Sequence, residues 1–78
     1  MTPFGTMLRQ ERKEKGLMLA TMAKDLGISS PYLSQIETGA KPIKESFVNR
    51  VIAYFELSQS EAEALRRAAA KSLPATLR

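Results

Sequence analysis

Residues 22–39 constrain the fold of this chain more than any other segment. Apolar residues at helical spacing run up to Leu26, Gly27 interrupts them, and a second run extends from Ser30 to another glycine, Gly39. Glycine adopts a left-handed backbone at little cost, so each glycine is expected to end a helix. Two short helices joined by such a tight turn predict a helix-turn-helix, a shape that fits the DNA major groove.

Three further helices are expected around this pair, because apolar side chains recur there at helical spacing. A hydroxyl N-cap and a proline open the first helix at Thr2 and Pro3, and either Ser29 or Ser30 caps the third. A capping box over residues 58–61 opens the last helix. The five predicted helices cover residues 3–15, 19–26, 30–38, 43–55 and 59–71. Together they predict an all-α five-helix bundle over residues 1–73 and a frayed tail over residues 74–78.

Composition limits the chemistry open to this chain. It has 78 residues, enough for one small domain, and it contains neither cysteine nor histidine. Thiol nucleophiles, imidazole bases and the usual zinc ligands are therefore missing. We expect a protein that is not an enzyme and needs no metal or cofactor.

The charge balance favours a polyanionic partner. The formal net charge is +4 and the sequence pI is near 9.8, which suits double-stranded DNA, although a solvated basic surface would give the same numbers. No apolar run reaches the roughly 20 residues needed to cross a bilayer. The first residues also lack a basic segment followed by an apolar one, as a signal peptide would have. These features predict a cytoplasmic protein without a membrane partner.

The outward face of the third predicted helix carries the candidate base-reading residues Ser30, Pro31, Ser34 and Gln35. An amide such as that of Gln35 can make a bidentate contact with adenine, and serine hydroxyls can donate to or accept from several bases. Pro31 offers an apolar surface to a thymine methyl group. Alternatively these side chains are only solvated, and Ser30 serves only as a cap.

The wider pattern resembles the phage-repressor, or Cro/XRE-like, helix-turn-helix family. The resemblance covers about residues 4–57 and is carried by Arg12…Gly16-Leu17, Met22-Ala23…Leu26-Gly27-Ile28-Ser29, Tyr32-Leu33-Ser34-Gln35-Ile36-Glu37, Gly39 and Lys41-Pro42. It implies a DNA-binding transcription regulator, with the helix-turn-helix formed by the second and third helices.

The resemblance also implies roles for individual residues. Arg12 and Glu37 match an arginine and a glutamate that pair to fix the recognition helix, the alternative being unpaired surface charges. Phosphate contacts are implied for Lys41, with Thr38, Tyr32 and Lys44 as further candidates, and these would set affinity rather than sequence preference.

One departure from the family pattern lies at the start of the second helix. The family usually has Thr or Ser followed by Gln there, which cap the helix and hold a phosphate. Met18 and Leu19 stand in these positions, and neither side chain donates a hydrogen bond. That contact is expected to be lost, or taken over by backbone amides, Lys13 or Lys15. Met18 is alternatively an apolar contact for a protein partner.

Two hypotheses about function follow. The first is a sequence-specific repressor or autoregulator that binds a palindromic operator as a homodimer. Its expected dimer contacts are Tyr54, Leu57, Ala62, Leu65 and Ala69, although these residues alternatively only close the core. The second is a protein-binding module, such as the antitoxin of a toxin–antitoxin pair that also represses its own operon.

Overall fold

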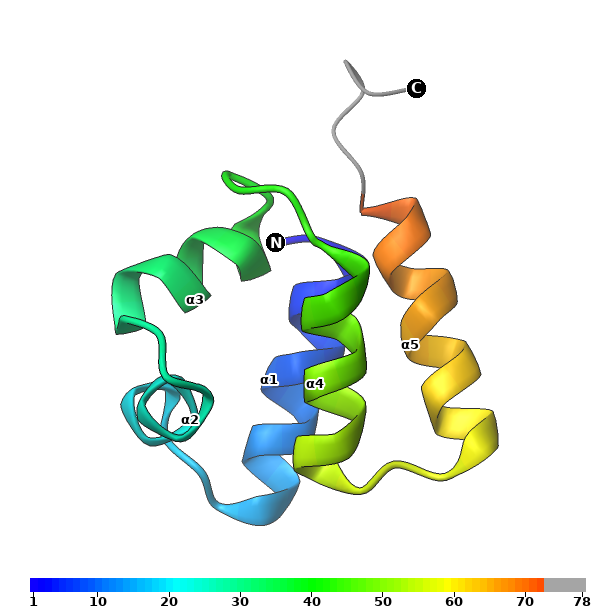
Figure 1. Ribbon diagram of the computed structural model, residues 1–78, viewed down its shortest axis with the longest axis horizontal. Coiled ribbons are helices and arrows are strands. Elements are labelled where there is room, and N and C mark those ends of the chain that lie inside the picture. Colours follow the sequence, from blue (N-terminus) through cyan, green and yellow to red (C-terminus); the bar gives the residue numbers. More distant parts are fainter. Residues whose placement is uncertain (73–78) are drawn as a thin grey trace.

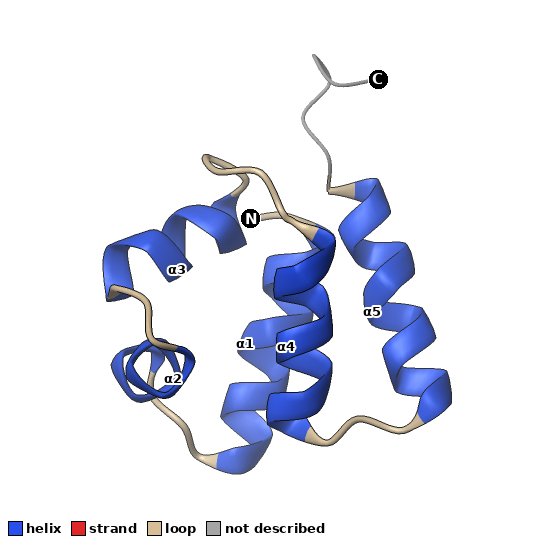
Figure 2. Cartoon of the chain, viewed as in Figure 1, coloured by secondary structure: helices blue, strands red, loops and turns tan. Residues whose placement is uncertain are grey.

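The computed structural model describes residues 1–72, which contain five α-helices joined by short turns (Figures 1 and 2). The helices are α1 (Pro3–Lys15), α2 (Leu19–Leu26), α3 (Ser30–Thr38), α4 (Glu45–Phe55) and α5 (Gln59–Lys71). No strand occurs in this part of the chain, so the predicted all-α five-helix fold is confirmed. The predicted boundary between domain and tail at residues 73 and 74 lies outside the described residues.

The helix ends follow local chemistry that the sequence displays. Gly16, Gly27 and Gly39 each follow a helix with a left-handed backbone, with φ of 65°, 73° and 91°. The capping box forms as predicted, because the Ser58 hydroxyl accepts from the Glu61 amide and the Glu61 carboxylate accepts from the Ser58 amide. The hydrogen bond from the Ser58 amide holds the pKa of the Glu61 carboxyl below its ordinary value.

The predicted start of the fourth helix at Ile43 is wrong. The helix begins at Glu45, and its N-cap Lys44 has an extended backbone, with φ −86° and ψ 146°. Ile43 nevertheless packs against the core from the preceding loop. Apolar spacing reports which side chains face the core, and an apolar residue can reach the core from a non-helical backbone.

The core lies around α1, which packs against α3 and α5 (Figure 1). Phe4 and Leu8 of α1 are completely buried, and the Phe4 ring meets Phe47 of α4 edge-on, with 6.2 Å between centroids. Leu33 and Ile36 attach α3 to the same core. Each such side chain contributes about 1.5–3 kcal/mol by leaving water, so these contacts hold α3 against the rest of the bundle.

Candidate nucleic-acid interface

The turn between α2 and α3 consists of Gly27, Ile28 and Ser29. Gly27 supplies the left-handed backbone, and Ile28 is half-buried against the core. The Ser29 hydroxyl accepts from the Tyr32 amide at 3.2 Å and is therefore the N-cap of α3. Because Ser29 has this capping role, the hydroxyl of Ser30 is left for other contacts.

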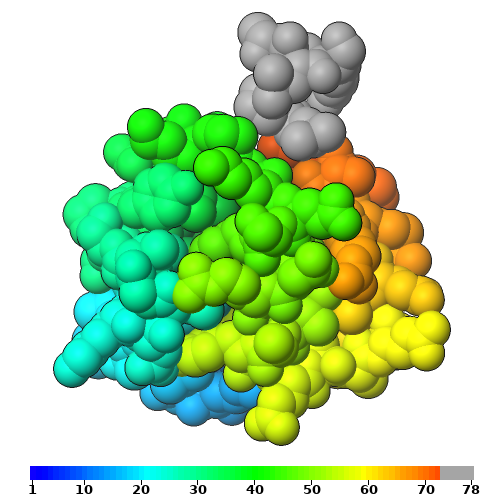
Figure 3. Space-filling view, in the orientation of Figure 1, coloured from blue at the N-terminus to red at the C-terminus, as the bar shows by residue number. Residues whose placement is uncertain are grey.

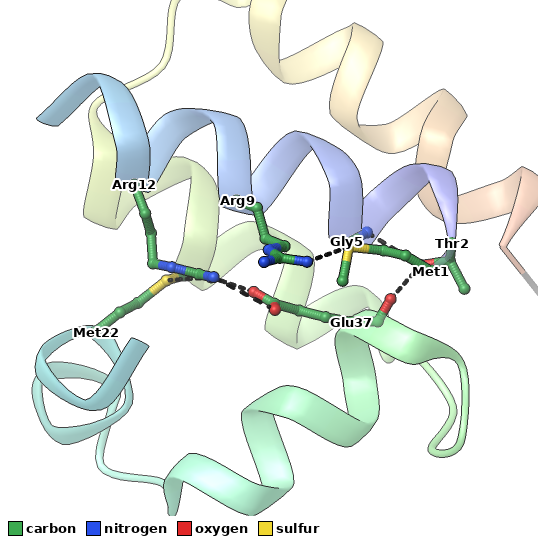
Figure 4. A network of polar contacts seen from close by, with 7 residues as sticks. All are labelled: Met1, Thr2, Gly5, Arg9, Arg12, Met22 and Glu37. Atoms are coloured by element: carbon green, nitrogen blue, oxygen red, sulfur yellow. Dashed lines mark hydrogen bonds and ion pairs between the residues drawn. The ribbon is translucent and has the colours of Figure 1, made fainter. Parts of the chain in front are cut away.

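A buried ion pair joins α1 to α3. Arg12 and Glu37 are only 7% and 3% exposed, and both carboxylate oxygens of Glu37 receive hydrogen bonds from the guanidinium. The Arg12 guanidinium also contacts the sulfur of Met22 on α2 at 4.0 Å (Figure 4). One side chain of α1 therefore touches both helices of the helix-turn-helix. Removing one partner of such a pair would leave an uncompensated buried charge, so separating Arg12 from Glu37 is costly.

The end of α3 is also tied to the start of α1, which the sequence did not reveal. The carbonyl oxygen of Glu37 accepts from the Thr2 amide at 3.1 Å and from the Thr2 hydroxyl at 2.8 Å (Figure 4). The two backbones approach so closely that a Cβ on Gly5 would lie 2.1 Å from this oxygen. A glycine in the first turn of a helix is unfavourable in itself, and it was the one available signal of this contact.

The outward face of α3 is polar. Pro31, Gln35 and Thr38 are exposed, whereas Ser30 and Ser34 are partly buried. None of these five residues carries a charge, so the surface can present an amide, hydroxyls and an apolar ring. Such groups suit hydrogen bonds and methyl contacts at base edges.

The loop after α3 presents two exposed cations, Lys41 and Lys44. Its backbone is anchored, because the Lys41 amide donates to the Gln35 carbonyl at 3.2 Å. Tyr32 is half-buried and packs against the core. Both cations lie in the segment that joins α3 to α4, and exposed lysines of this kind can bind phosphates.

The start of α2 has no side-chain cap, as the departure at Met18 and Leu19 predicts. Met18 is the N-cap residue but makes no side-chain hydrogen bond, and it is 72% exposed. Within residues 1–72 the other exposed large apolar side chain is that of Met1, at 56%.

Two hydrogen bonds from α4 side chains hold α2 in place, and the sequence did not predict them. The Tyr54 hydroxyl donates to Asp25 at 2.6 Å, and Arg50 donates to the carbonyl oxygen of Leu26. Burial of the phenol and its bond to Asp25 raise the pKa of Tyr54 to about 12. The Leu26 carbonyl belongs to the last turn of α2, where helical partners are missing, so Arg50 fulfils a capping function.

The residues expected at a dimer interface are not all available to a second chain. Leu65 and Ala62 are 2% and 6% exposed and belong to the interior of the monomer. Tyr54, Leu57 and Ala69 are partly exposed. The expectation that Leu65 and Ala62 contact a partner copy is therefore corrected, because helix closure within one chain already covers them.

Among residues 1–72, no helix is both long and apolar enough to span a membrane, and no group of three or more acidic side chains is placed to hold a metal ion. The fold and the exposed α3 define the class of the protein: an all-α domain with a helix-turn-helix formed by α2 and α3.

Comparison with known proteins agrees with this class. Residues 3–73 match the sequence model of the family described as "Helix-turn-helix domain", and the chain belongs to this family. It is also 51% identical over 36 residues to the "ImmF control region 10 kDa protein" of Bacillus phage phi105. That match covers 46% of this chain and 40% of the phage protein. No solved structure matches the chain significantly.

Proposed function

We propose that the chain is a sequence-specific regulator of transcription that binds double-stranded DNA and represses by occupying its operator. The observation that carries this proposal is the way in which α3 is held against the rest of the bundle. Its inner face is fixed by the Arg12–Glu37 pair and by Thr2, while its outer face is polar and open. A helix held this firmly presents its side chains to DNA in one register, which reduces the entropy cost of binding.

The contacts divide into two kinds. Ser30, Pro31, Ser34 and Gln35 of α3 face base edges, whereas the neighbouring cations Lys41 and Lys44 bind phosphates. Thr38 and Tyr32 complete the phosphate-binding set. Because α3 carries no arginine or lysine for guanine, the shape and deformability of the operator supply a larger share of the sequence preference.

A single α3 spans only a few base pairs, so we propose a homodimer on a palindromic operator. Its two half-sites would lie about 34 Å apart, one turn of the duplex. The control-region name of the phage relative supports a regulatory role for this chain.

Footprinting on DNA that flanks the gene, in the presence of excess non-specific duplex, tests this proposal. We expect protection of a short symmetric site at moderate salt. Equal affinity for all duplexes under these conditions would refute sequence-specific regulation. For substitution of Gln35 on α3, the matched control is Gln59→Ala, which removes an exposed amide on α5 instead.

The exposure of Met18 favours a second candidate function, a protein-binding module such as an antitoxin that also represses its own operon. An exposed methionine at a helix start where the family usually holds a phosphate offers an apolar contact to a protein. A small toxin gene in the same operon and a stable complex between the two proteins would support it. Loss of that complex in Met18→Thr, with DNA binding retained, would assign the contact to Met18.

A further inference from the structure

A shallow groove of about 360 Å³ lies between the start of α4 and the second half of α5. These two segments, green and orange in Figure 3, lie beside each other at the surface. Val48 is buried at the floor of the groove, Ile43 and Ala69 are partly buried, and Ala70 is exposed. The groove is therefore mainly apolar, and its alanines allow another backbone to approach closely.

Opposite charges border this groove. Glu45 projects from the first turn of α4 and Arg66 from α5, and both are exposed. The ion pairs found within residues 1–72 join Arg12 to Glu37 and Lys15 to Glu11, so neither involves the two groove charges. Arg66 donates to the side-chain oxygen of Asn49 at 2.8 Å, which positions the guanidinium while leaving further N–H donors for a partner.

A surface with one acidic and one basic border around an apolar floor is complementary to itself after a two-fold rotation. We infer that this α4–α5 groove is the surface on which a second copy of the chain docks, with Glu45 of each copy facing Arg66 of the other. The inference rests on the operator-binding dimer proposed above and names its interface. Of the dimer residues expected from the sequence, Ala69 lines this groove.

The position of the groove connects dimerisation to DNA binding. Ile43, which lines the groove, lies in the loop between the phosphate-binding candidates Lys41 and Lys44. Docking through the groove places the loops of both copies near the two-fold axis, with each α3 adjoining its own loop. The lysines of the two loops, Lys41 and Lys44 of each copy, then repel one another in the free dimer, and binding of DNA phosphates relieves this repulsion.

Sedimentation velocity of the full chain without DNA, over a range of micromolar concentrations, tests the inference. We expect a monomer–dimer equilibrium for the wild type. Glu45→Arg and Arg66→Glu should each raise the dimer dissociation constant by about tenfold or more, because each reversal places like charges in both symmetric pairs. The double variant exchanges the charges and should regain dimerisation. Arg67→Glu reverses an exposed neighbouring charge outside the groove and is the matched control.

Circular dichroism of each variant verifies folding, since a cation in the first turn of α4 opposes the helix dipole. If Glu45→Arg unfolds, the dimer dissociation constants of Arg66→Glu and Arg67→Glu are compared instead, and only Arg66→Glu should raise the constant. A wild-type dimer unaffected by the groove reversals would overturn this interface while leaving the proposed operator-binding dimer intact. A wild-type chain that stays monomeric would overturn the inference. A groove-dependent dimer that binds all duplexes equally would instead support the interface and refute sequence-specific regulation.

Discussion

Replacing Gly5 by alanine tests how α1 determines the position of α3. In most helices this change is stabilising by about 1 kcal/mol, because alanine is the better helix former. Here the new Cβ would lie 2.1 Å from the carbonyl oxygen of Glu37 and 2.8 Å from its Cα and carbonyl carbon. All three atoms belong to the backbone of α3, so no side chain can rotate away. The end of α3 must move by about an ångström, against the packing of the core.

The size of the effect follows from what that movement disturbs. Both hydrogen bonds from Thr2 to the Glu37 carbonyl weaken, at about 0.5–1.5 kcal/mol each, and overpacking adds about 1–3 kcal/mol. After subtracting the gain in helix propensity, we expect Gly5→Ala to lower the free energy of unfolding by about 1–5 kcal/mol. Such a loss is a large part of the stability of a domain of this size.

Urea unfolding followed by circular dichroism measures this difference. Thr6→Ala is the matched control, because Thr6 is the next residue of α1 and is exposed. It should leave stability unchanged or raise it slightly. If Gly5→Ala is as stable as the wild type and binds DNA equally well, the close approach of α1 and α3 does not position the recognition helix.

Three further perturbations test the buried ion pair, the phosphate contact of Lys41 and the titration of Tyr54. Arg12→Met should lower the free energy of unfolding by about 3–5 kcal/mol in urea titrations, because it leaves the buried Glu37 carboxylate unpaired. Adding Glu37→Gln should recover part of this loss. A loss below about 1 kcal/mol in Arg12→Met would contradict the buried pair. Lys41→Ala should weaken binding to all duplexes about equally and flatten the dependence of log K on log salt, as measured by fluorescence anisotropy; a changed sequence preference would instead assign Lys41 to base reading. Because the pKa of Tyr54 is raised to about 12 in the folded chain from an ordinary 10, the free energy of unfolding should fall as pH rises between these values. Tyr54→Phe should lack this part of the pH dependence. An identical dependence in both proteins would show that it does not come from the titration of Tyr54.

Local signals in the sequence predicted the helix-turn-helix closely. Glycines at the three helix ends and the serine cap of α3 act within one turn of the chain, so a linear sequence displays them directly. For this reason the predicted bounds of α2 and α3 match those of the structure.

Features that depend on contacts between helices were harder to predict. The approach of Gly5 to Glu37, the Tyr54–Asp25 bond and the Arg50 contact with Leu26 join residues 24–32 positions apart. Spacing within one helix carries no information about them. The same limitation explains the dimer prediction, because an apolar stripe on α5 does not distinguish burial in one chain from burial against a second. Leu65 is covered within the monomer, whereas Ala69 borders the groove.

We propose above that α3 reads base edges while the following loop binds phosphates. Selection of bound sequences from random duplexes, carried out with the wild type and with Gln35→Ala, tests it most directly. We predict a palindromic site for the wild type. For Gln35→Ala we predict the same site, with discrimination at one base position per half-site reduced by about 1–3 kcal/mol. Selection of the same sequences with unchanged discrimination at every position would contradict base reading by Gln35, and failure to enrich any sequence would contradict the claim as a whole.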